Sequence, residues 1–160
     1  MELDSKLQRN IMGRFATGVT VVTTAGIGGT GGLTANAVAS LSLEPALVLV
    51  AVDKRAGSYA EITTNGCYAI NILGLEHEVI SQRFSTPGPK DFSGFKWKTA
   101  VTGAPILEDA LGYVDCRLHE ILPGGDHDIF IGQIVAGEVR EDGQPLLYFS
   151  GKYRQLADAP

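Results

Sequence analysis

Cysteine, histidine and positive charge are scarce in this 160-residue sequence, and long apolar runs are absent. The two cysteines, Cys67 and Cys116, lie in apolar stretches without CxxC spacing, so buried free thiols and a cytoplasmic location are expected. The net charge of −5 argues against nucleic acid as a partner, because neutralising phosphates needs a basic face. The longest apolar run, residues 46–52, is far below the roughly 20 residues of a membrane span. The first ten residues, MELDSKLQRN, carry acids and lack the apolar core of a signal peptide, so no membrane association is predicted.

Glycine, by contrast, is abundant: there are 20, about twice the usual share of roughly 7%. Apolar residues recur every four positions at 3, 7, 11 and 15, which predicts a first helix that Gly18 would end. Short helices are expected near 58–64 and 76–84, and a loop at 86–95. The predicted strands are 19–24, 46–52, 67–72, 111–122, 128–139 and 146–153. The fold class predicted is mainly β, a barrel with peripheral helices forming one domain over residues 1–160.

One motif points to a different fold. Gly26, Gly28 and Gly31 match G-x-G-x-x-G after a predicted strand, with Asp53 about 20 residues further on, as in a dinucleotide fingerprint. A Rossmann turn must open into a helix whose N-terminus receives a pyrophosphate. Residues 33–43, LTANAVASLSL, instead alternate with period two, which is typical of a strand. We interpret residues 26–32 as a loop serving a hairpin, and a Rossmann dehydrogenase remains a rival that a helix at 33–43 would support.

The alternation places Thr34, Asn36, Ser40 and Ser42 on one strand face. This face is either solvated or the binding edge for a ligand such as a flavin ring, which is flat and apolar with a polar rim. In the stretch DKRAGSY that follows, Lys54, Arg55 and Ser58 form either an exposed turn or a corner suited to a phosphate.

Five blocks of the sequence carry a resemblance to a known family. They are residues 15–24 (FATGVTVVTT), 32–52 (GLTANAVASLSLEPALVLVAV), 71–85 (NILGLEHEVISQRFS), 125–134 (GDHDIFIGQI) and 148–156 (YFSGKYRQL). In order and spacing they resemble the short-chain flavin reductases, the small components of two-component flavin-dependent monooxygenases such as phenol and 4-hydroxyphenylacetate hydroxylases. The resemblance covers nearly the whole chain.

The resemblance implies an FMN-binding split barrel, antiparallel and Greek-key-like, that forms a homodimer with flavin sites near the subunit interface. The implied reaction is reduction of FMN or FAD by NADH or NADPH, with reduced flavin released to a partner monooxygenase. A non-catalytic flavin carrier on the same barrel is the alternative.

The resemblance also implies roles for individual residues. The flavin ring and ribityl chain would be lined by Thr34, Ala35, Asn36, Ala37, Ser40, Leu41 and Ser42. The ribityl phosphate would be held by Asp53, Lys54, Arg55 and Ser58. Arg83 and Phe84 match an RF position that lies against the rest of FAD. Tyr153, flanked by Lys152 and Arg154, matches a residue that closes the nicotinamide side.

His127 stands between Asp126 and Asp128. Adjacent residues of an extended strand point to opposite faces, so these three side chains cannot converge on one ion, and no metal site is predicted. From the residues alone, His127 is a ligand clamp or an ordinary turn residue. The resemblance assigns it contact with the nicotinamide cofactor in the catalytic site. Because the cofactors carry the hydride chemistry, we expect His127 to position the nicotinamide and not to act as an obligatory proton donor.

Overall fold

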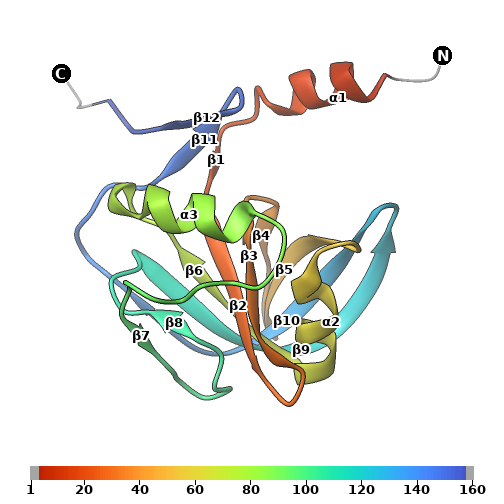
Figure 1. The fold of residues 1–160 in the computed structure, drawn as a ribbon, viewed down its shortest axis with the longest axis vertical. Coiled ribbons are helices and arrows are strands. Elements are labelled where there is room, and N and C mark those ends of the chain that lie inside the picture. The colour runs from red at the N-terminus through yellow and green to blue at the C-terminus, as the bar shows by residue number, and fades with distance from the viewer. Residues whose placement is uncertain (1–3, 158–160) are drawn as a thin grey trace.

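The computed structural model describes residues 4–157, in which antiparallel strands predominate and helices lie at the periphery (Figure 1). The helices are α1 (Ser5–Met12), α2 (Gly57–Asn65) and α3 (Glu78–Ser85), the last preceded by a 3-10 turn, Leu75–His77. The strands are β1 (Thr17–Gly18), β2 (Thr20–Gly26), β3 (Gly29–Ala35), β4 (Val38–Leu43), β5 (Ala46–Asp53), β6 (Cys67–Ile72), β7 (Trp97–Lys98), β8 (Ile106–Leu107), β9 (Gly112–Gly124), β10 (His127–Val139), β11 (Leu147–Phe149) and β12 (Lys152–Arg154).

Seven of these strands form one sheet in the order β3-β2-β6-β9-β10-β5-β4. β3 and β4 are neighbours in the chain but lie at the two ends of this order, joined only by Asn36 and Ala37. A sheet whose ends are joined by so short a link must curl round on itself, which gives a barrel with an open seam between β3 and β4. The prediction of a mainly β barrel is confirmed.

Apolar side chains pack on both faces of the sheet. Adjacent residues of β2 point to opposite faces, so Val22 joins Phe130 and Ile62 of α2 in the barrel interior. Val21 packs on the outer face with Phe84 of α3. Each buried aliphatic or aromatic side chain of this kind contributes about 1.5–3 kcal/mol relative to an exposed one. The two clusters together fix α2 and α3 against β2 and β3.

The predicted first helix is shorter than the sequence pattern indicates. It begins after Asp4, whose carboxylate accepts a hydrogen bond from the N–H of Lys6, and it ends at Met12 with Gly13 as its C-cap. Gly18 lies instead in β1, and Leu3 is outside the described residues. No residue of α1 is buried, so tertiary packing within the chain does not extend the helix to Phe15.

The stretch 33–43 is extended, as predicted, but it is two strands and not one. β3 pairs with β2, and β4 pairs with β5. The link at Asn36 and Ala37 keeps the alternating pattern while sending the chain to the other end of the sheet. The absence of a helix here overturns the Rossmann alternative.

Two other predicted segments differ in extent. Residues 26–32 are mostly strand, because Gly26 pairs with Gly29 and only Ile27 and Gly28 form the hairpin turn. The segment 146–153 is split into β11 and β12 by a turn at Ser150 and Gly151, both with positive φ. The other predicted strands, both short helices and the loop at 86–95 are confirmed.

Cys67 and Cys116 are free and buried. In the β6–β9 ladder Cys67 is paired with Arg117, so Cys116, one residue earlier, points to the opposite face of the sheet. A disulfide between them is therefore excluded by strand geometry. Among residues 4–157, no helix has the length and hydropathy needed to cross a membrane.

Candidate flavin site

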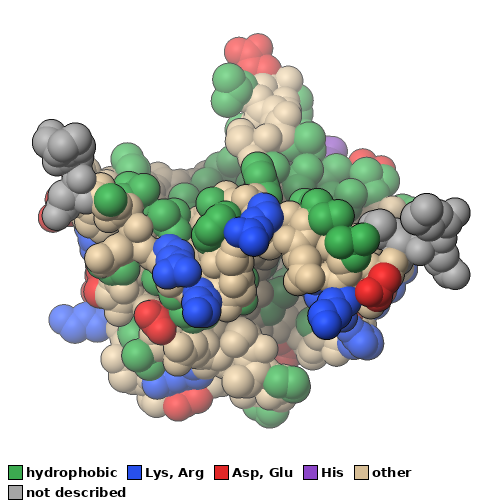
Figure 2. Space-filling view, turned by 90° about the horizontal axis from the view of Figure 1, so that it is seen from above, with side chains coloured by type: hydrophobic (Ala, Val, Ile, Leu, Met, Phe, Trp, Pro, Cys, Tyr) green, Lys and Arg blue, Asp and Glu red, His purple; other side chains and the backbone are tan. Residues whose placement is uncertain are grey.

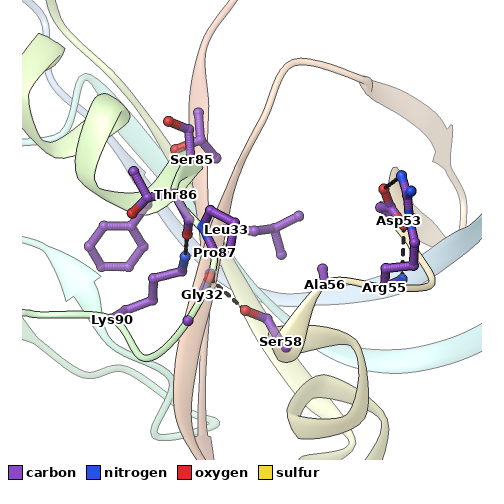
Figure 3. A pocket seen from close by; sticks show the side chains of 14 residues that line it. Gly32, Leu33, Asp53, Arg55, Ala56, Ser58, Ser85, Thr86, Pro87 and Lys90 are labelled. Carbon is purple, nitrogen blue, oxygen red and sulfur yellow. Dashed lines mark hydrogen bonds and ion pairs between the residues drawn. The ribbon is translucent and has the colours of Figure 1, made fainter.

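Three cavities adjoin one another along the seam between β3 and β4. The first, about 490 Å³, lies between β3, the start of α2 and the loop after α3 (Figure 3). The second, about 190 Å³, shares Thr34 with the first. The third is a groove of about 790 Å³ that shares Asn36 with the second. The first and third cavities have volumes in the range that accommodates a small organic ligand.

The first cavity contains an ion pair and a helix N-terminus. Asp53 accepts from the guanidinium of Arg55 at two points, Nε at 3.1 Å and Nη2 at 2.8 Å. This hydrogen bonding holds the pKa of Asp53 well below its usual value. Ser58, in the first turn of α2, is buried and donates from Oγ to the carbonyl oxygen of Gly32 at 2.5 Å. The N–H groups of Gly57 and Ser58, the first two of α2, have no intrahelical partner and are suited to an anion, whereas that of Tyr59 donates to the carbonyl oxygen of Ala56.

Lys54 does not share this corner with Arg55 and Ser58. Its Nζ lies 3.2 Å from Oδ1 of Asp128 and donates to the carbonyl oxygen of Gly125 at 2.8 Å. Asp128 also accepts from the hydroxyl of Tyr59 at 2.6 Å, and this bond is the main cause of its lowered pKa. Lys54 therefore links the end of β5 to the β9–β10 turn, and it is not among the residues that line the first cavity with Arg55 and Ser58.

The glycines of β3 allow the walls of the first cavity to approach closely. A Cβ on Gly32 would lie 2.6 Å from the carbonyl oxygen of Val22 and 2.8 Å from Cε1 of Phe84. At Gly31 a Cβ would overlap the carboxylate of Glu61. The sequence G-x-G-x-x-G thus serves the packing of α2 and α3 on β3, and no pyrophosphate turn is formed.

The sequence interpretation missed one wall of this cavity. The loop after α3 contributes Ser85, Thr86, Pro87, Gly88 and Lys90. Its proline and glycine indicate a loop, but nothing in the local pattern indicates where the loop packs. The ammonium group of Lys90 donates to the carbonyl oxygen of Thr86, and partial burial lowers its pKa.

The second cavity brings together three predicted residues from distant parts of the chain. Thr34 donates to the carbonyl oxygen of Ser81 at 2.6 Å. The hydroxyl of Ser81 is 2.7 Å from that of Tyr153 on β12. Asn36, which also lines this cavity, donates to Oγ1 of Thr17 at 3.2 Å. The third cavity continues past Asn36 along Ala37 and is largely apolar, with Val38, Leu49 and Ile129 in its walls.

Four residues of the predicted ladder do not line these cavities. The side chain of Ala35 is buried in the barrel interior. Ser40, Leu41 and Ser42 lie further along β4, where a bulge interrupts the pairing with β5 between Ser40 and Ser42. The ladder expected on one strand face is therefore divided by the Asn36–Ala37 link.

The remaining predicted residues are spread over the rim and the periphery. Phe84 lines the first cavity, whereas Arg83 donates to the carbonyl oxygens of Asp91 and Ser93 and faces the following loop. Lys152 and Arg154 are exposed on β12 on either side of Tyr153.

His127 begins β10 and is the register partner of Asp53 on β5, which places it beside the rim of the first cavity. Its Nδ1 lies 2.8 Å from Oδ1 of Asp126, and its side chain is 43% exposed. Asp128 points the other way and is buried. Within residues 4–157, no three His, Cys, Asp or Glu side chains are placed to hold a metal ion.

Comparison with known proteins identifies this arrangement. The model of the flavin reductase like domain matches residues 12–157. The chain belongs to the flavin reductase-like domain family. It is 41% identical to the FMN reductase (NADH) RutF of Agrobacterium fabrum over 150 residues, which cover 92% of this chain and 86% of that protein. It is 37% identical to the flavin-dependent monooxygenase reductase subunit HsaB of Rhodococcus jostii over 152 residues, 94% of this chain and 77% of that protein.

Solved flavin reductases have the same fold. The flavin reductase PheA2 superposes with a TM-score of 0.88 at 41% identity, covering 98% of this chain and all of that one. The NADH:FAD oxidoreductase SgcE6 of Streptomyces globisporus, in complex with NAD and FAD fragments, superposes with a TM-score of 0.92 at 32% identity, covering 99% of this chain and 98% of that one. The family and the split-barrel fold predicted from five sequence blocks are confirmed.

Proposed function

We propose that this protein is an NADH-dependent flavin reductase that uses FMN or FAD and releases the reduced flavin to a separate monooxygenase. The main support for this function is the similarity, over nearly the full chain, to reductases whose names include NADH and FMN or FAD. The row of three cavities on the barrel seam supports this function, because a polar cavity at one end is followed by an apolar groove at the other.

The cavities fit the two halves of a flavin nucleotide. The first offers a cation and a helix N-terminus, which suit the phosphate. The third offers apolar walls of the kind a flat ring needs, and the hydroxyl and amide groups of Thr34 and Asn36 lie between the two. When bound, the flavin accepts a hydride from the nicotinamide, so the cofactors supply the reactivity.

The protein's own residues then bind and orient. Thr34 and Tyr153 are held through Ser81, which fixes the middle of the seam. His127, whose Nδ1 is paired with Asp126, lies beside the cavity rim, where its ring positions the nicotinamide nucleotide. Bringing two flat rings into contact is worth several orders of magnitude in rate without an acid–base pair.

A homodimer is part of the proposal. No residue of α1 is buried, and Ile11 and Met12 of α1 and Phe15, just after it, are more than half exposed. Figure 2, which views the end of the molecule where α1 lies, shows hydrophobic side chains spread across this face. Met12 and Phe15 also line the large apolar groove, so a second copy would cover the helix and close the groove over a ligand at once.

The dimer has a direct test. Phe15→Asp places a charge in the proposed interface and is expected to convert the protein to a monomer in size-exclusion chromatography with light scattering. Phe15 is 70% exposed in the single chain, so the substitution removes no buried contact within it. A wild-type protein that is monomeric at micromolar concentration would contradict the dimer.

The reductase activity is tested by following NADH oxidation with FMN, FAD and riboflavin added in turn, and again with NADPH. Flavin-dependent NADH oxidation, followed by hydroxylation when a family monooxygenase is added, is the expected result. Flavin binding without turnover with either nicotinamide would favour the non-catalytic carrier.

A further inference from the structure

Three cations lie in or near the first cavity, but they are not equivalent. The resemblance assigns the flavin phosphate to the stretch that contains Lys54 and Arg55. Lys54 does not line the cavity and is paired with Asp128 at 3.2 Å. Arg55 lines the cavity, but its Nε and Nη2 both donate to the carboxylate of Asp53. Its side chain is 83% exposed. The charge of each is therefore already balanced by a carboxylate of the chain.

Lys90 is different. In the part of the chain that the structure describes, no carboxylate oxygen lies within 4.0 Å of its ammonium group. Its hydrogen-bond partner is a neutral group, the carbonyl oxygen of Thr86, and Glu61 acts on it only at longer range. Burial lowers its pKa, so the ammonium is partly stripped of water without gaining an ion pair. Such a group has the most to gain from an incoming anion.

The position of Lys90 also suits a phosphate. Figure 3 shows Lys90 at one end of the cavity and the Asp53–Arg55 pair at the other, with Gly32 and Ser58 between them. The Ser58 hydroxyl donates to Gly32 and the N–H of Tyr59 donates to the carbonyl oxygen of Ala56, whereas the N–H groups of Gly57 and Ser58, at the start of α2, have no partner within the helix. An anion between Lys90 and this turn would receive both a charge-assisted hydrogen bond and the helix N-terminus.

We propose that Lys90 is the cation that binds the phosphate of the flavin nucleotide and thereby distinguishes FMN and FAD from riboflavin. This rests on the proposed function, because it takes the ligand of the seam to be a flavin. The phosphate-binding role is thus assigned to a residue of the loop after α3 and not to Lys54 or Arg55.

The experiment compares Lys90→Met with Lys90→Arg and with Lys96→Met. Lys96 is an exposed lysine of the same loop region that lines none of the three cavities, so its substitution removes the same net charge at a distance. Dissociation constants for riboflavin, FMN and FAD are measured by quenching of flavin fluorescence, and folding of each variant is checked by thermal melting.

Lys90→Met is expected to weaken FMN and FAD binding roughly tenfold, as for loss of one charge-assisted hydrogen bond, with riboflavin changed less than about twofold. Lys90→Arg should retain most of the FMN affinity, and Lys96→Met should change none of the three. If Lys90→Met does not fold, the wild type supplies the test: inorganic phosphate should compete with FMN but not with riboflavin.

Three results would overturn the proposal. Equal weakening of riboflavin and FMN would mean that Lys90 shapes the cavity without contacting phosphate. A raised KM for NADPH or NADH with unchanged FMN affinity would assign Lys90 to the nicotinamide nucleotide. Unchanged binding of every ligand would leave it outside the site. Because flavin binding is measured without NADH, a protein that binds FMN through Lys90 yet does not oxidise NADH would refute the reductase function and leave this assignment standing.

Discussion

Replacing Gly32 with alanine tests whether the close approach of β3, β2 and α3 is needed to build the first cavity. The added Cβ would lie 2.6 Å from the carbonyl oxygen of Val22 and 2.8 Å from Cε1 of Phe84. Neither neighbour is free to move. Val22 belongs to the strand paired with β3. Phe84 is buried and packs edge-on against Phe92, with ring centroids 5.1 Å apart.

The size of the effect follows from this geometry. Adding a methyl group to a well-packed site costs typically 1–3 kcal/mol. Since one of the two clashes is with backbone, a cost of about 2 kcal/mol is expected. For a protein of this size, that lowers Tm by about 4–8 °C and the urea midpoint by about 1 M. FMN affinity should also fall, because Gly32 and Phe84 both line the cavity.

The assay is thermal and urea unfolding of Gly32→Ala beside Gly57→Ala. Gly57 has open space around its missing Cβ and lies at the first position of α2, so alanine there is expected to leave Tm unchanged or raise it slightly. A Gly32→Ala protein with the Tm of the wild type would refute the argument that β3 is glycine-rich because of packing.

Two further predictions concern the turn that carries His127. His127→Ala is expected to raise KM for NADH about tenfold, because one hydrogen bond to a charged ligand is lost, while the flavin Kd changes less than about twofold. Unchanged NADH kinetics would show that His127 is not part of the site. Asp128→Asn tests the acid side of the stability profile. Hydrogen bonding from Tyr59, and then the charge of Lys54, lower the pKa of Asp128, so its ionised form stabilises the fold above about pH 3.9, where an unfolded aspartate titrates. Thermal melting should show the wild type more stable than the variant at neutral pH, with the gap closing as the pH falls below about 4 and through the lower folded pKa; a gap that does not depend on pH would contradict this reasoning.

The elements that could be predicted are those whose signal is local. The β-branched run at 19–24 and the apolar run at 46–52 form β2 and β5, and the short helix predicted near 76–84 is the 3-10 turn and α3. In each case the pattern reflects burial of one or both faces of a single element. The length of α1 was overestimated for the same reason, because an apolar stripe is present but nothing in the chain packs on it.

The division of the ladder could not be predicted from alternation. A two-residue link preserves period two, so residues 33–43 look like one strand although β3 and β4 pair at opposite ends of the sheet. Strand order depends on pairings between distant segments, which leave no trace in a local pattern.

The ion-pair partners of the charged residues could not be predicted from the sequence either. Lys54 and Arg55 are adjacent and look alike in the sequence, yet Lys54 pairs with Asp128 across the sheet and Arg55 with Asp53 in its own turn. Both residues lie in the turn that follows β5, so strand alternation does not predict where their side chains go. Lys90 lines the cavity because the loop after α3 packs beside β3, and the local sequence does not indicate this tertiary contact.

The open seam explains why the site lies where it does. β3 and β4 are each hydrogen-bonded on one side only, so their outer edges offer unpaired backbone groups and side chains that no neighbouring strand covers. Small residues there, Gly32 on β3 and Ala37 in the link, line the cavities of the seam. A ligand with a charged tail and a flat apolar body satisfies both the polar edge and the apolar groove. A bound flavin would therefore close the seam of the barrel. Amide hydrogen exchange should slow in β3 and β4 when FMN is added, whereas exchange in β6 and β9, which are paired on both sides, should change little.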